Sequence, residues 1–143
     1  MGLREIWKNL VDAGGTGGLN WHLHAFQSQK RWQATVAHIE HFLLHCQPRY
    51  KHLLLMGCSA GWMMPTKWLT QFDRIDAFDI DPLAQSLFNW RHGRTLQQSQ
   101  THTTHHRQDA LACLPEILKQ HPQASLWFDN MLGQHRYRIR RSE

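Results

Sequence analysis

Leu53-Leu-Leu-Met-Gly-Cys-Ser-Ala-Gly61 is the stretch that decides the expected fold, together with Asp76-Ala-Phe-Asp-Ile-Asp-Pro82. The first is an apolar run that ends in a glycine-bearing turn, and the second is an apolar run that ends in carboxylates about twenty residues later. Glycines let the backbone approach a ligand closely, and an acid at the next strand end accepts hydrogen bonds from a ribose. The pair predicts a nucleotide-type cofactor site in a parallel sheet.

Strand and helix patterns alternate along the rest of the chain. Helical spacing of apolar residues predicts helices before and between the apolar runs, and β-type runs predict strands. This alternation predicts an α/β fold, an open parallel sheet of about four strands flanked by helices. The expected strands are 52–56, 75–80, a weakly apolar one within 97–108 that ends at Asp109, and 125–128. The expected helices are 2–13, 21–46, one from about Trp62, Pro82 to about Arg91, and 111–120.

Composition limits the class of protein. With 143 residues, 41% hydrophobic and 19% charged, the chain is typical of a globular protein, and no apolar run is long enough to span a membrane. Charges near the N-terminus argue against a secretory signal, so we expect a cytoplasmic protein. Three scattered cysteines predict neither disulfides nor a CxxC metal site. Four arginines lie within residues 134–141, where a solvated tail is favoured over binding to nucleic acid.

The motifs resemble those of class I S-adenosylmethionine-dependent methyltransferases. In that family the first strand runs into a glycine-rich loop under the methionine part of the cofactor, which matches Gly57-Cys58-Ser59-Ala60-Gly61. An acid that ends the second strand holds the ribose hydroxyls, and Asp79 takes that place with Ile80 against the adenine. The third motif, near the adenine amino group, matches Asp109-Ala110. The fourth, at the site of methyl transfer, matches Asp129-Asn130 after Phe128.

The resemblance covers about residues 50–133 and implies a Rossmann-like domain at 50–143, preceded by a helical extension at 1–49. The family's strand order implies that the four strands lie in the order 3-2-1-4. The chain departs from the family pattern at Leu55, where an acid usually helps to anchor the cofactor's amino group, and at Ser59, where a glycine is usual. Because the family's sheet has seven strands, we expect the front part of a longer fold, with a partner that completes the sheet or a sufficient four-stranded core as alternatives. The exposed edge of the sheet could allow self-association.

Other functions also fit parts of the pattern. Gly57–Gly61 spells G-x-S-x-G, so Ser59 could be an esterase nucleophile, with Asp109 or Asp129 and His121 or His135 as partners. A dinucleotide oxidoreductase is disfavoured because G-x-G-x-x-G needs glycine at Ser59 and Trp62. A non-catalytic cofactor-binding or interaction module is a further alternative.

The remaining features carry weaker predictions. Three groups of histidines (His22 and His24; His38, His41 and His45; His102, His105 and His106) lack zinc-site spacing, so no metal site is expected. Asp81 is expected to cap the following helix, and the glycines at 14–18 to form a lid or a linker. Trp62 and Trp127 are expected in the core, although they border the crevice. The methyl acceptor and the catalytic residues are left open.

Overall fold

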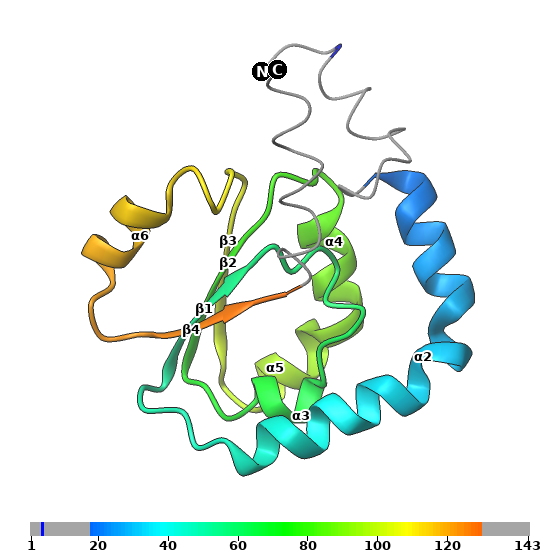
Figure 1. The fold of residues 1–143 in the computed structure, drawn as a ribbon, viewed down its shortest axis with the longest axis horizontal. Helices are drawn as coiled ribbons and strands as arrows, with labels where there is room; N and C mark the ends of the chain where they lie inside the picture. Colours follow the sequence, from blue (N-terminus) through cyan, green and yellow to red (C-terminus); the bar gives the residue numbers. More distant parts are fainter. Residues whose placement is uncertain (1–3, 5–17, 130–143) are drawn as a thin grey trace.

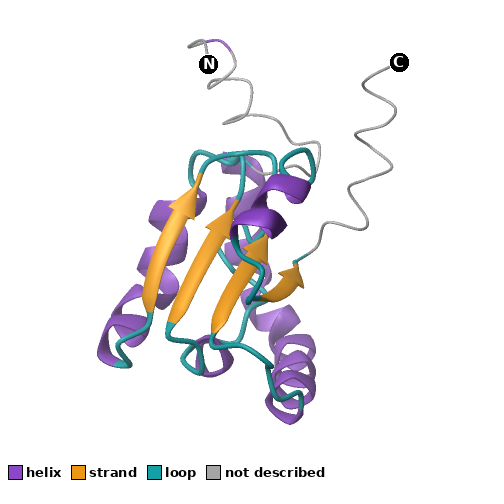
Figure 2. Cartoon of the chain, turned by 90° about the vertical axis from the view of Figure 1, so that its left-hand side faces the viewer, coloured by secondary structure: helices purple, strands orange, loops and turns teal. Residues whose placement is uncertain are grey.

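The computed structural model describes Arg4 and residues 18–129 and has an open sheet of four parallel strands. The strands follow the order β3-β2-β1-β4, which confirms the expected α/β class and strand order. They lie side by side and point the same way (Figure 2). Their bounds are His52–Met56 for β1, Arg74–Phe78 for β2, His102–His106 for β3 and Ser125–Phe128 for β4.

The central strand β1 is buried on both faces, as its unbroken apolar run predicts. Alternate residues separate into two clusters. Leu53 and Leu55 pack with the aromatic and aliphatic residues of the α3–α5 side, whereas Leu54 and Met56 pack with Ile117 of the α6 side. Helices therefore cover both faces of the sheet (Figure 1).

The helices differ from the expected ones mainly in where they begin. They are α2 (Leu19–His45), α3 (Thr66–Leu69), α4 (Ala84–Phe88), the π-helical turn η1 (Asn89–Gly93), α5 (Arg94–Gln98) and α6 (Leu114–Gln120). The helix expected from Trp62 starts only at Thr66, because Gly61 has φ +64° and Pro65 is extended. In contrast, the helix expected to end at about Arg91 continues through η1 and α5.

The long helix α2 buries less of its apolar surface than its sequence predicts. Its fully buried positions are His22, Ala25, Ser28 and Leu43. Phe42 is apolar, yet it is 60% exposed. Among the described residues, α2 runs along the outside of the sheet domain and contacts it near α3 (Figure 1).

The topology has one switch point, and it lies beside β1. The connections through α3 and through α4–α5 carry the chain from β1 outward to β3, whereas α6 returns it across the other face to β4. Loops that leave β1 and β4 therefore diverge at the carboxyl edge. In open α/β sheets this is where ligands bind.

Several expectations fall outside the described residues: the helix at 2–13, the glycines at 14–17, Asn130 and the arginine-rich stretch with His135. Across residue 4 and residues 18–129, no helix has the length and apolarity needed to cross a membrane.

Candidate functional site

The turn after β1 is held in an unusual backbone conformation. Gly57, Ser59 and Gly61 all have positive φ, of 65°, 49° and 64°. The amide of Gly57 donates to Phe78 O at 2.8 Å, and the amide of Gly61 donates to Cys58 O at 2.7 Å. Positive φ is uncommon for a residue with a side chain, so Ser59 adopts it against a steric cost. Such strain is concentrated in turns that bind ligands.

Asp79, which follows β2, accepts a hydrogen bond from this turn. The amide of Ser59 donates to Asp79 Oδ2 at 2.7 Å, and the amide of Asp81 donates to Asp79 Oδ1 at 2.8 Å. The loop and the carboxylate therefore lie side by side. Both oxygens of the Asp79 carboxylate thus accept a backbone amide, which fixes the carboxylate at this edge.

Asp129 brings a second carboxylate to the same place from the end of β4. Its amide donates to Met56 O at 2.9 Å, and the residue is only 8% exposed. Burial, and then the negative charge of Asp79, raise its pKa to about 7. Burial also raises the pKa of the Cys58 thiol, and the charges of Asp79, Asp129 and Asp81 add to that rise. The site therefore concentrates negative charge.

We expect this charge to make the stability of the protein depend on pH. Because Asp129 has a higher pKa in the folded chain than in the unfolded chain, folding takes up a proton between about pH 4 and pH 7, and this contribution to stability is lost as the pH rises through 7. The rise from 3.8 to about 7 corresponds to roughly 4 kcal/mol.

Asp129→Asn should remove the pH-dependent contribution of this carboxyl group to stability. The variant should therefore be more stable than the wild type at pH 8 and close to it at pH 4, which urea unfolding at both pH values measures. Parallel curves for the two proteins from pH 4 to pH 8 would contradict a raised pKa at Asp129.

Asp81 connects the same edge to helix α2. Its Oδ2 accepts from His22 Nε2 at 2.6 Å and from the amide of Gly18 at 3.3 Å. Trp62 Nε1 donates to His22 Nδ1 at 3.0 Å, so the proton of the neutral imidazole lies on Nε2 and points to Asp81. These hydrogen bonds hold Gly18 and the start of α2 at the carboxyl edge of the sheet.

Asp81 supports the turn before α4, although the expectation that it caps this helix is wrong. Its Oδ1 accepts from the amide of Leu83 at 2.9 Å. The helix begins at Ala84 with Leu83 as its N-cap, so Asp81 acts before the cap position and not at it.

The third expected motif lies partly in the core. Asp109 Oδ1 accepts from the amides of Leu111 and Ala112, at 3.0 and 3.2 Å, and so holds the turn before α6. Ala110 is buried in the cluster of Phe78, whereas Ile80 is half-buried at the edge. The structure thus brings together loop 57–61, Asp79 and Asp129, and places Asp109 beside its own helix.

A small hollow of about 110 Å³ lies beside Asp79. Its lining comes from the ends of β2 and β3 and the start of α4: Ala77, Asp79, Asp81, Pro82, Ala84, Gln85, His105, His106 and Arg107. Pockets that enclose small ligands have about 300–1,000 Å³, so this hollow can hold only part of a nucleoside.

His92 supports the loop from behind. This buried histidine donates from Nε2 to Gly61 O at 3.0 Å and accepts at Nδ1 from the Thr66 hydroxyl at 2.7 Å. Burial lowers its pKa to about 4, so the ring is neutral near pH 7. No sequence pattern indicates this contact, because η1 carries His92 to the loop from 31 residues away.

The structure does not assemble the esterase triad from the described candidates. The buried hydroxyl of Ser59 makes no hydrogen bond within residues 18–129. His121 lies beside His52, at the amino end of β1, with ring centroids 5.1 Å apart. It is therefore at the opposite end of the sheet from Ser59, and His135 lies outside the described residues.

The two tryptophans near the crevice are used in packing, as expected. Trp62 is buried between α2 and the loop, with the Arg91 guanidinium 4.4 Å from its ring centre. Trp127 packs against Trp68 on the α3 side of the sheet. We therefore assign neither tryptophan a role in binding a ligand.

Comparison with known proteins finds no family model, no curated protein and no solved structure that matches this chain.

Proposed function

We propose that this chain is an S-adenosylmethionine-dependent methyltransferase or the cofactor-binding portion of one. The observation that carries the proposal is the hydrogen bond from the Ser59 amide to Asp79 Oδ2, which joins the positive-φ turn to a carboxylate beside the switch point of the sheet. A nucleoside bound at this edge would meet the half-buried turn and a fixed acceptor together.

Each part of the cofactor has a proposed place. Loop 57–61 supports the methionine part, Asp79 accepts from the ribose hydroxyls, and Ile80 lies against the adenine. Hydrogen bonds to a charged acceptor contribute roughly 1.5–3 kcal/mol each, so Asp79 is expected to supply much of the affinity. Asp109 and Ala110 would lie nearer the adenine amino group.

The charge of the site favours this cofactor over a dinucleotide. S-adenosylmethionine carries a sulfonium and an ammonium group, whereas a dinucleotide brings an anionic pyrophosphate. Asp79 and Asp129 lie close enough for the charge of one to raise the pKa of the other, so a nearby cation is favoured and a phosphate is repelled. In addition, α3 starts only at Thr66, whereas pyrophosphate sites place a helix N-terminus against the glycine turn.

Methyl transfer from a sulfonium needs little chemistry from the protein. The acceptor attacks the methyl carbon as the carbon–sulfur bond breaks, and the bonding electrons stay on sulfur. Holding the two reactants in line supplies much of the acceleration. Asp129 is placed by the proposal beside the sulfonium, where its negative charge stabilises the cofactor. We assign no catalytic base and no class of methyl acceptor.

Calorimetric titration of the full chain with S-adenosylmethionine tests the proposal. We expect one equivalent to bind, and the affinity to increase from pH 5.5 to pH 8 as Asp129 ionises. Circular dichroism of the same sample verifies that the chain is folded. A folded chain that binds no cofactor at millimolar concentration would exclude both a methyltransferase and a non-catalytic binder of this cofactor.

A further inference from the structure

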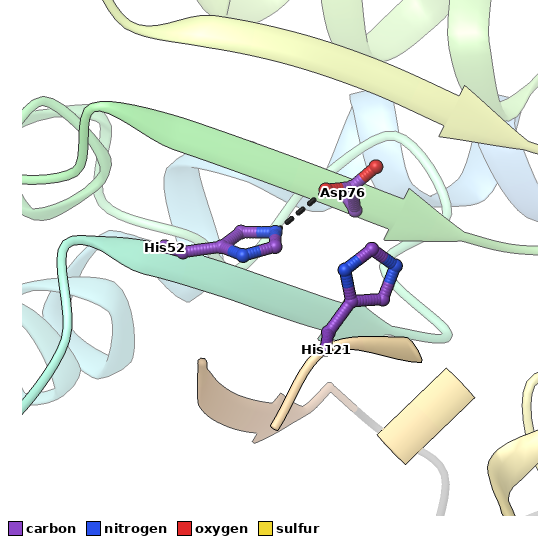
Figure 3. Close-up of side chains that lie close together, drawn as sticks. All are labelled: His52, Asp76 and His121. Atoms are coloured by element: carbon purple, nitrogen blue, oxygen red, sulfur yellow. Dashed lines mark hydrogen bonds and ion pairs between the residues drawn. The ribbon is translucent and has the colours of Figure 1, made fainter. Parts of the chain in front are cut away.

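A second polar cluster lies away from the carboxyl edge, on the α6 face of the sheet. It consists of His52, the first residue of β1, Asp76 in the middle of β2, and His121, which follows α6 (Figure 3). His52 is at the opposite end of β1 from the turn at 57–61. The cluster therefore does not share residues with the proposed cofactor site.

The three side chains converge on one small volume. One donor atom from each of them lies within 4.8 Å of the others. His52 Nε2 is 2.6 Å from Asp76 Oδ2, and the rings of His52 and His121 are perpendicular. Within residue 4 and residues 18–129, this is the one group of three or more metal-ligating side chains that comes so close.

Asp76 is fully buried yet ionised. Burial alone would raise its pKa, but hydrogen bonds from His106, Arg74 and His52 outweigh burial and lower the pKa to about 2. His106 Nε2 is 2.7 Å from Oδ1, which leaves Oδ2 facing His52. A fixed carboxylate oxygen next to imidazoles is the nitrogen and oxygen donor set that zinc binds in three-ligand sites.

We propose that His52, Asp76 and His121 bind a divalent transition-metal ion of the zinc class, with water in the fourth position. The ion takes the place of the hydrogen between His52 Nε2 and Asp76 Oδ2, and the proton of the neutral imidazole moves to Nδ1, so that the ring stays neutral and Nε2 donates its lone pair to the metal. His106 stays on Oδ1 and orients the carboxylate, as outer hydrogen bonds commonly do for metal ligands.

The site needs only a modest movement to close. Ligands at 2.0–2.1 Å from zinc in a tetrahedron lie about 3.3 Å apart, which is less than the present limit of 4.8 Å. The ring of His121 makes no hydrogen bond to any residue of the described chain, and the residue lies just beyond the end of α6. A rotation of this side chain can therefore bring its nitrogen inward.

Arg74 opposes the ion and sets its affinity. Its Nε lies 2.8 Å from Asp76 Oδ2, and its side chain is 51% exposed. When the metal binds, the guanidinium can turn into solvent, but its positive charge remains nearby. The bound ion would then tie the connection between α6 and β4 to the two central strands.

Zinc titration of the full chain by calorimetry tests this site. Because the protein has 12 histidines, the titration uses a His41→Ala/His45→Ala background, which removes an exposed pair whose rings lie 4.4 Å apart on α2. In this background we expect one equivalent of zinc to bind and the melting temperature to rise with zinc. Adding His121→Ala should weaken binding at least tenfold and abolish the rise.

Arg74→Gln in the same background should bind zinc more tightly, by at least threefold, because the competing charge is gone. No binding of one equivalent in the background protein, or an affinity unchanged by His121→Ala, would overturn the proposal. A weaker affinity in Arg74→Gln would contradict the placement of the ion at Asp76 Oδ2. His121 is partly exposed, so its replacement does not endanger the fold.

Discussion

Gly61→Ala should lower the free energy of unfolding by about 3 kcal/mol or more. Gly61 has φ +64°, a conformation that costs a residue with a side chain roughly 1–2 kcal/mol. The added Cβ would also lie 2.8 Å from His92 Nε2 and 3.0 Å from the Phe88 ring. Both neighbours are buried, so they cannot move aside freely, and overpacking typically costs a further 1–3 kcal/mol.

Urea unfolding measures this change, and Gly93→Ala is the matched control. Gly93 lies in η1, and its added Cβ would meet only Asn89 Cβ, at an ordinary 3.5 Å. Alanine there should leave the stability unchanged or raise it by up to about 1 kcal/mol, since glycine is a poor helix former. Equal losses in the two variants would mean that the turn at 57–61 does not require its observed conformation.

Asp79→Asn should weaken the binding of S-adenosylmethionine at least tenfold. The substitution keeps the shape of the side chain but removes the charge and exchanges one acceptor oxygen for a donor. The ribose hydroxyls would therefore lose a charged acceptor. The new NH₂ group would also face the amide of Ser59 or of Asp81, and two donors repel each other. A tenfold loss corresponds to about 1.4 kcal/mol, which one charge-assisted hydrogen bond can account for.

Calorimetry on both proteins measures the effect, with Asp73→Asn as the control. Asp73 is exposed and precedes β2, so its replacement removes the same charge away from the site. Thermal melting of Asp79→Asn separates a loss of affinity from a loss of fold. If the folded Asp79→Asn variant binds the cofactor as tightly as wild type, Asp79 does not hold the ribose.

Three of the strands were predictable because each follows a local apolar pattern, whereas β3 has the weakly apolar sequence His-Thr-Thr-His-His and ends at His106, before the expected end at Asp109. The run Leu53–Met56 is apolar without interruption and is bounded by Pro48 and Gly57, so its limits could be read directly. The bounds of the helices were less predictable from the sequence, because the ends of helices depend on tertiary contacts. The conformation at Gly61 delays α3, and the exposure of Phe42 reflects how little of the sheet domain α2 reaches.

In the candidate site, too, local patterns were predictable and tertiary contacts were not. The contact between Ser59 and Asp79 could be predicted, since neighbouring parallel strands bring their carboxyl ends together. The contacts of Asp81 with His22 and of Asp76 with His52 and His106 could not. Each joins residues 24 to 59 positions apart, and histidine spacing along the sequence gives no sign of them.

The most direct test of the central claim is a nitrogen–proton correlation spectrum of the labelled chain, recorded during titration with S-adenosylmethionine. If the turn and Asp79 hold one nucleoside, the amides of Gly57, Ser59, Gly61 and Asp81 should shift together and saturate at one equivalent. Amides near His52, at the other end of β1, should stay in place. A folded chain whose loop amides do not move at saturating cofactor would contradict the account.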